Sequence, residues 1–476
     1  MKNTIVKSIT CIVVILSFFT LTAQVPQKWL LEPIPDNWEY VSKHRQKLPT
    51  EDDWWETFED PVLDSLISLA EKENYNLSAA LSRIEMAKKN LDITKSAYFP
   101  TIDLSAGWSG GQTSGAIGKM VTSATRHDYF SLGATMQWEI DLFGKISQNA
   151  KVGKAEYNAS RAEYDGVMVS LAANVAKAYI NLRTYQNELL VAQDHLGQQK
   201  KVLAIVEARF KAGLSDMLDV TQSKTVVAST QASIPPIEAM IETSINSLAL
   251  LTAKYPRQLH EWLSRPSEMP KVIYGANLGT PADLLRRRPD IIQAECQLAQ
   301  YAAEVGVAKK DFLPTLSLLG SIGSSAHDVK NIFSDNSLYW EISPTLSWTL
   351  FDGMARNHRT AEASAQLEAA IDSYNYTVMN AVIEVKNATT TYRSSIESVR
   401  LIGDVIEQSQ KSLQLSVDLY KKGLTPFINV VDAQMKFLEN QNSRIVAEGN
   451  ALTSVVNLYQ ALGGGWNVAE SSNATK

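Results

Sequence analysis

The sequence predicts a mainly α-helical protein that also carries membrane β-strands and is built as an internal two-fold repeat. Three sequence landmarks recur in the same order about 210 residues apart. Each half holds one helical pattern far too long for a compact domain, together with two segments of strict polar–apolar alternation. These observations predict long helices packed side by side and strands with one apolar face.

The repeat is visible in three pairs of matching segments. Lys95–Ile102 resembles Lys309–Leu316, and Trp138–Gly144 resembles Trp348–Gly353. The third pair is Phe210–Val220 and Tyr420–Val430. A period this long exceeds that of solenoid repeats, so it indicates a duplicated half. We expect an N-terminal arm and first repeat over 24–253, a second repeat over 254–463 and a tail over 464–476.

The N-terminus has the pattern of an export signal. Lys2 and Lys7 precede an apolar run from Ile9 to Leu21, and Ala23 ends a small-residue cleavage site. Residues 1–23 are therefore predicted to be a secretory signal peptide, because the run is short for a membrane anchor. Cys11 lies inside this run, which argues against a lipidated N-terminal cysteine. Cys296 is then the only mature cysteine and is expected to be buried.

The longest predicted helices span 145–212 and 354–422. Both show an apolar residue at every seventh position, the seam of coiled-coil-like packing. In the first helix the seam is Met168, Val175, Leu182, Leu189, Leu196, Leu203 and Phe210. In the second it is Ile371, Val378, Val385, Tyr392, Val399, Ile406, Leu413 and Tyr420. Each helix is about 100 Å long at 1.5 Å per residue.

Both long helices are predicted to end in tight turns. Gly213 and Gly423 suit the left-handed position after a helix, and Ser215 and Thr425 suit the N-cap of the next one. Pro426 then takes the first helical position. Return helices follow over 216–253 and 426–462, and two further helices are expected over 62–99 and 290–313.

Four segments are predicted to be strands, at about 101–110, 129–142, 315–324 and 339–350. Each has nearly the length that a tilted strand needs to cross a bilayer. A soluble sheet with one buried face shows the same alternation. The helices, however, use their apolar stripes on each other and leave nothing to cover this face. Four strands cannot close a barrel, whereas three copies supply twelve.

These features together resemble the TolC-type outer-membrane factors, specifically the NodT branch of outer-membrane efflux proteins. The most specific motif runs from Pro281 to Glu295 (PADLLRRRPDIIQAE), and Trp54–Leu63 supports it. The resemblance implies a homotrimer with a 12-stranded outer-membrane β-barrel and a 12-helix periplasmic α-barrel. It also implies service as a passive exit duct for small molecules, with a periplasmic adaptor and an inner-membrane transporter as partners.

The resemblance also implies where function lies. The constriction at the periplasmic end would involve Asp219, Asp432, Asn429 and Tyr420. Asn429 and Thr425 stand where the best-known family member has an aspartate and an arginine, which implies fewer charge links. The adaptor-docking turns would be Gly213, Leu214, Ser215, Gly423, Leu424 and Thr425.

The assignment of Asp219 to the constriction has a structural alternative. Asp219 is equally explained as an acid that stabilises a helix N-terminus. Three copies of Asp432 would form an acidic ring that favours cations. In an exported protein, we interpret Arg286-Arg287-Arg288 as the start of a helical element with equatorial salt bridges, not as a nucleic-acid site.

Nothing in the sequence indicates catalysis, a cofactor or a metal. The six histidines are scattered, two cysteines form no ligand framework, and a net charge of −6 gives no support for nucleic-acid binding. We therefore expect no enzyme. Two alternatives to the efflux duct stay open, namely the exit duct of a protein secretion system and a periplasmic coiled-coil structural protein without a pore.

Overall fold

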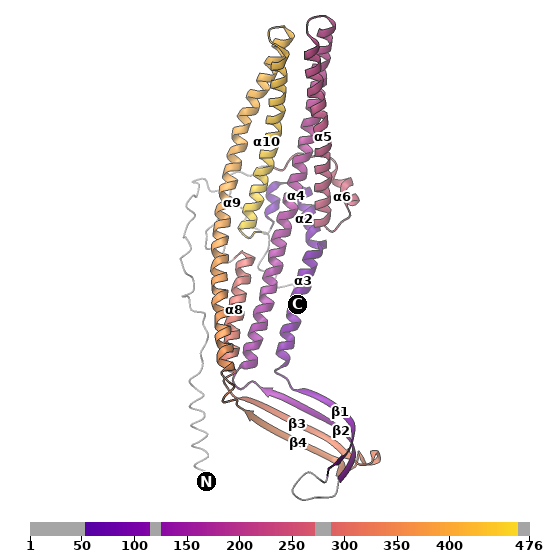
Figure 1. The fold of residues 1–476 in the computed structure, drawn as a ribbon, viewed down its shortest axis with the longest axis vertical. Coiled ribbons are helices and arrows are strands. Elements are labelled where there is room, and N and C mark those ends of the chain that lie inside the picture. Colours follow the sequence, from indigo (N-terminus) through magenta and orange to yellow (C-terminus); the bar gives the residue numbers. More distant parts are fainter. Residues whose placement is uncertain (1–52, 115–124, 272–286, 465–476) are drawn as a thin grey trace. The chain divides into compact units, whose positions relative to one another are not determined.

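The computed structural model describes residues 53–114, 125–271 and 287–464. The predicted signal peptide, Arg286 and the tail beyond residue 464 lie outside the described residues. The chain divides into two compact units. The sheet unit holds the described residues of 89–156 and 296–375, and the helical unit holds those of 34–88, 157–295 and 376–476. Both units therefore draw on both halves of the sequence (Figure 1).

The sheet unit contains one antiparallel sheet in the order β1-β2-β3-β4. Its strands are β1 (Thr101–Thr113), β2 (Thr125–Ile140), β3 (Thr315–Ala326) and β4 (Leu338–Ser347). The short helices η4 (Val329–Asn331) and η5 (Asp335–Ser337) lie in the β3–β4 connection. All four predicted strands are confirmed. The fourth ends at Ser347, not at residue 350, because Ser347 pairs with Thr315, the first residue of β3, and residues beyond it have no partner on that strand.

The pairing register brings the four apolar strand faces together. Ile102 lies opposite Met136, and Ile322 lies opposite both Ala134 and Trp340. Directly opposed residues of an antiparallel pair point to the same side of the sheet. This apolar face has no cover in the protomer, where Trp340 is 72% exposed.

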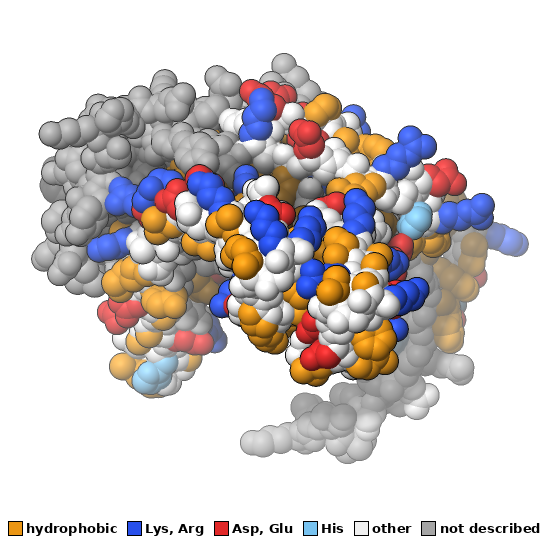
Figure 2. Space-filling view, turned by 90° about the horizontal axis from the view of Figure 1, so that it is seen from above, with side chains coloured by type: hydrophobic (Ala, Val, Ile, Leu, Met, Phe, Trp, Pro, Cys, Tyr) orange, Lys and Arg blue, Asp and Glu red, His pale blue; other side chains and the backbone are white. Residues whose placement is uncertain are grey.

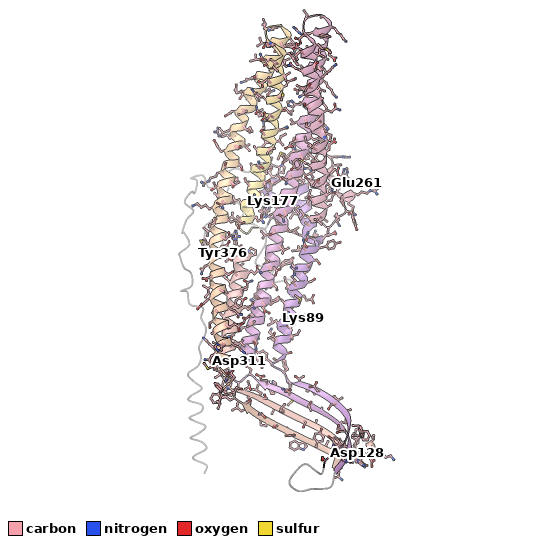
Figure 3. The ribbon with its side chains drawn as sticks, in the orientation of Figure 1. Lys89, Asp128, Lys177, Glu261, Asp311 and Tyr376 are labelled. Carbon is pink, nitrogen blue, oxygen red and sulfur yellow. The ribbon has the colours of Figure 1, made fainter. Side chains whose placement is uncertain are left out.

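Helix ends in the sheet unit are held by ion pairs near the strands. Lys145 begins α4 and lies 2.7 Å from Asp311, which follows α8 (Figure 3). Arg356 pairs with Asp352 at 2.9 Å and also donates to the Asp311 carbonyl. These contacts fix the start of both long helices beside the strands.

The long helices are α4 (Lys145–Lys211) and α9 (Ala355–Lys421), and each has 67 residues. Their return helices, α5 (Met217–Leu251) and α10 (Phe427–Ala461), have 35 residues each. The predicted spans agree to within two residues. On α4 the seam is fully buried at Val175 and Leu182 and becomes exposed at Phe210.

The prediction of a single helix over 62–99 is wrong. The structure has α2 (Pro61–Glu73) and α3 (Tyr75–Ser96), separated at Asn74. The Asn74 side chain accepts from the backbone of Asn76 and Leu77 and donates to the Leu251 carbonyl at 2.7 Å. Asn74 thus caps a new helix, and its backbone is extended.

The remaining helices are α8 (Pro289–Lys310), which was predicted, α6 (Pro256–Leu263), which was not, and the 3-10 helix η3 (Trp54–Phe58). Cys296 on α8 is partly exposed, not buried as predicted, because α8 buries Ile291 and Ala294 on another face. No helix within 53–114, 125–271 and 287–464 is long and apolar enough to cross a membrane.

The main core belongs to the helical unit. Tyr179 and Ile180 of α4 pack there with Leu66 of α2 and Leu248 of α5. Trp54 of η3 stacks on Tyr459 of α10 with ring centroids 5.0 Å apart. We call the buried apolar cluster that contains these side chains, and that includes Ile241 of α5, the equatorial cluster. It anchors the base of both helical hairpins.

Candidate functional site

The α4–α5 and α9–α10 turns share one backbone design. Gly213 and Gly423 have φ of 72° and 74°, the left-handed conformation that only glycine adopts freely. The Leu214 N–H donates to the Arg209 carbonyl at 2.9 Å, closing the helix end, and Leu424 makes the matching bond. The predicted left-handed conformation of Gly213 and Gly423 after the two long helices is therefore confirmed.

Each return helix begins one residue later than predicted. Asp216, not Ser215, caps α5, because its carboxylate accepts from the Asp219 backbone N–H at 3.0 Å. Pro426 takes the N-cap of α10 with an extended backbone, so α10 begins at Phe427. Thr425, the predicted cap, instead accepts a hydrogen bond from the Asn429 side chain at 2.7 Å.

Tyr420 and Asp219 form a link between α9 and α5. The Tyr420 hydroxyl donates to the Asp219 carboxylate at 3.1 Å. Tyr420 is 5% exposed, and its ring lies 5.1 Å from that of Phe427. Burial and the bond to Asp219 both raise the pKa of Tyr420, so its hydroxyl stays a neutral donor. Family resemblance assigned both residues to one site, and the structure brings them together.

Arg209 completes this link, although no sequence pattern pointed to it. Its guanidinium lies 4.9 Å from the centre of the Tyr420 ring and donates to the carbonyls of Lys421 and Leu214. One side chain therefore contacts both turns. The repeat offers no signal for it, because the matching position in the second half is Leu419.

Valines hold the two hairpins together beside this link. The residues that pack with Tyr420 come from α4, α5 and α10, and they are Val206, Val220, Val226, Phe427, Val430 and Val431. We call this group, with Tyr420, the tip cluster. It is separate from the equatorial cluster.

Asp432 has a different environment from Asp219. Its carboxylate pairs with Lys436 of the same helix at 2.8 Å, and both side chains are well exposed. Lys436 was not predicted at this site, although its i,i+4 spacing from Asp432 is visible in the sequence. Asp432 and Asn429 thus make local contacts, whereas Asp219 makes a contact between helices.

Both turns expose apolar side chains. Leu214 is 65% and Leu424 is 70% exposed, and Met217, Leu218 and Ile428 beside them are also exposed. Figure 2 looks onto this end of the hairpins and shows hydrophobic side chains next to lysines and arginines. Exposed apolar residues gathered at one place are typical of a protein contact site.

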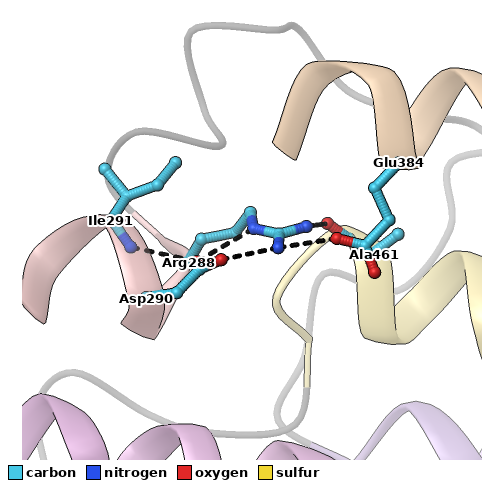
Figure 4. A network of polar contacts seen from close by, with 5 residues as sticks. All are labelled: Arg288, Asp290, Ile291, Glu384 and Ala461. Carbon is cyan, nitrogen blue, oxygen red and sulfur yellow. Dashed lines mark hydrogen bonds and ion pairs between the residues drawn. The ribbon is translucent and has the colours of Figure 1, made fainter. Parts of the chain in front are cut away.

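Arg288 is the centre of a second polar network, at the start of α8 (Figure 4). Its guanidinium pairs with Asp290 at 2.7 Å and with Glu384 of α9 at 2.8 Å, and donates to the Ala461 carbonyl of α10. The predicted equatorial salt bridge is confirmed for Arg288. Nearby, Lys177 of α4 donates to Gln460 (Figure 3).

In the part of the chain that the structure describes, no group of three or more His, Cys, Asp or Glu side chains is placed to hold a metal ion. A shallow groove lies between α9 and α10 and is lined largely by serine and asparagine. The sites of interest are therefore contacts between helices and exposed turns.

Comparison with known proteins gives one consistent family. Residues 66–254 and 280–464 match the family described as "Outer membrane efflux protein". The chain is 29% identical to "Nodulation protein T" of Rhizobium leguminosarum bv. trifolii over 416 residues, covering 87% of this chain and 88% of the relative. It is equally similar, at 29%, to "Solvent efflux pump outer membrane protein SrpC" of Pseudomonas putida, with the same coverage.

Solved structures agree with the sequence relatives. The outer-membrane channel OprN superimposes with a TM-score of 0.83 at 31% identity, covering 87% of this chain and 93% of that one. CusC gives a TM-score of 0.80 at 23% identity, covering 91% of this chain and 98% of that one, and so shares the fold.

Proposed function

Since the chain belongs to the outer membrane efflux protein family, we propose that three copies assemble into one continuous duct across the outer membrane and the periplasm. The protein is an outer-membrane channel component of an efflux pump and not an enzyme. We propose that, as such a component, it works with a periplasmic adaptor and an inner-membrane transporter. The trimer, the lipid contact and the gate are proposals as well.

The uncovered apolar face of the sheet carries the proposal. All four strands turn most of their apolar residues to one side, with Leu319 and Tyr339 on the other, and β1 and β4 are edge strands in the described sheet. Unpaired edges are costly in lipid, so the sheet must continue into another copy. Two copies would give eight strands, a barrel whose interior side chains fill. Three copies give twelve strands and leave a lumen.

We further propose that the hairpin turns form the closed periplasmic end. Tyr420 and Asp219 would hold neighbouring helices together, with Asn429 and Asp432 at the same end. The exposed Leu214 and Leu424 would meet the adaptor. Each repeat would thus supply one helical hairpin to this end, which is what we propose for the domain division at residues 253/254.

A pair of matched substitutions tests the membrane face. Ile342 lies on the apolar face of β4, and Thr345 lies on the opposite face of the same strand. Arginine at Ile342 would cost about 2–4 kcal/mol in the bilayer, whereas arginine at Thr345 would face the lumen. We expect I342R to prevent recovery of the protein in the outer-membrane fraction and T345R to leave it unchanged.

Trimer mass in detergent and the deletion phenotype complete the test. Recovery of a monomer in the soluble periplasm would contradict the duct and favour a structural coiled-coil protein. Increased drug susceptibility on deletion supports efflux. Loss of a secreted protein without a change in susceptibility would instead identify the exit duct of a secretion system.

A further inference from the structure

The two return helices differ at their middle, although both have 35 residues. Pro235 and Pro236 lie inside α5, whereas the matching positions of α10 are Ile445 and Val446. A proline has no N–H to donate, and its ring clashes with the carbonyl four residues earlier. The carbonyls of Gln231 and Ala232 therefore have no helical donor, a local weakness that α10 does not share.

Side-chain burial also differs between α5 and α10 at the level of the proline pair. From residue 231 to residue 240 of α5, no side chain is buried within the protomer. The matching stretch of α10, 441–450, buries Ile445, Ala447 and Gly449. A Cβ at Gly449 would lie 2.4 Å from the Thr184 hydroxyl, so α10 packs closely against α4 there. At this level α10 is firmly supported and α5 is not.

The proline pair also lies between the two apolar clusters. On α5 the tip cluster includes Val220 and Val226, and the buried residues of the equatorial cluster begin at Ile241, with Ile237 partly buried against them. At this level His195 of α4 hydrogen-bonds the Gln441 side chain of α10, and its ring lies 5.2 Å from that of Phe437. His195, Gln231 and Gln441 are each eighteen residues from a turn glycine. Burial of apolar side chains is thus interrupted on α5 between Val226 and Ile241, whereas α10 buries Phe437 and Ile445 over the matching stretch.

From these observations we propose that Pro235 and Pro236 form a hinge in α5. The tip half of α5 bends there and moves Val220 and Val226 away from the α10 residues of the tip cluster, while α10 remains a straight support. Bending at the proline pair leaves the equatorial cluster intact, since that cluster includes none of residues 231–236. This proposal can be tested by hydrogen exchange, which does not depend on the proposed duct, and by channel conductance, which does.

Hydrogen exchange of the full-length protein in detergent tests the hinge directly. We expect the backbone amides of residues 237–240 to exchange at least about tenfold faster than those of residues 447–450. The double substitution P235A/P236A should slow the α5 amides by about the same factor. Pro256 begins α6 outside this stretch, so P256A serves as the matched control and should change neither segment. Equal exchange in α5 and α10 would overturn the proposal.

Single-channel recording in planar bilayers tests whether the hinge opens the tip. We expect P235A/P236A to lower the fraction of time spent open severalfold, with P256A equal to the wild type. Slow exchange in the double variant with an unchanged open fraction would overturn the hinge as an opening device. If the wild type forms no pore at all, the duct fails, and the exchange result alone decides whether α5 bends.

Discussion

Replacing Tyr420 with phenylalanine removes one hydroxyl from the proposed gate and leaves the rest of the site in place. The hydroxyl donates to the Asp219 carboxylate at 3.1 Å. The ring contacts with Arg209 at 4.9 Å and with Phe427 at 5.1 Å do not use it. Y420F therefore isolates the contribution of one hydrogen bond between α9 and α5.

The size of the effect follows from the surroundings of the two groups. A hydrogen bond to a charged group contributes about 1.5–3 kcal/mol when its partner is buried. Asp219 is only partly buried, so water replaces some of the lost bond, and about 1 kcal/mol per protomer is a better value. This shifts the open–closed equilibrium about fivefold in one protomer. If three protomers open together, the combined shift exceeds about a hundredfold.

Single-channel recording gives the open fraction directly, and Y420F should raise it within this range. Tyr376 lies on the same helix and is 68% exposed, so Y376F is the matched control and should behave as the wild type. Thermal unfolding of Y420F in detergent should be nearly unchanged, because the equatorial cluster is untouched. An open fraction equal to that of the wild type would refute a closing role for the Tyr420–Asp219 bond.

Three further predictions concern charge. D432A should reduce the cation preference measured by reversal potential and K436Q should increase it, because Lys436 neutralises Asp432; no change in either would reject an acidic ring. R288Q should lower the free energy of unfolding by about 1–3 kcal/mol, because it removes the donor to the buried Ala461 carbonyl while the Asp290 and Glu384 side chains remain half-exposed, whereas R257Q at an exposed position of α6 should cost under about 0.5 kcal/mol. Burial raises the pKa of Asp165 from 3.8 to about 6, so the folded state holds a proton that the unfolded chain releases, and stability rises as pH falls from 7 towards 4. D165N should therefore stabilise the protein at pH 7.5, by up to about 3 kcal/mol, and give no gain at pH 4; a gain independent of pH would exclude this cause.

Local sequence patterns predicted the helix bounds and the apolar strand faces, because these depend on residues close together in the chain. Seven-residue spacing and Gly213 define α4 to within one residue, and alternation identifies which side of each strand is apolar. The break at Asn74 was missed because it depends on the carbonyl of Leu251, 177 residues away. Arg209 was missed for the same reason, since its partners lie on another hairpin.

The site residues came from family resemblance, and the structure clarifies what the substitutions in this chain mean. Where the best-known member is charged, Thr425 and Asn429 bond to each other within one turn. The remaining link between helices is the Tyr420–Asp219 bond, supported by Arg209 and by a cluster of valines. Apolar burial does not respond to ionic strength as exposed ion pairs do. If the proposed gate is closed in this way, it opens when the helices move apart, so opening requires bending of the hairpins and not neutralisation of a charge.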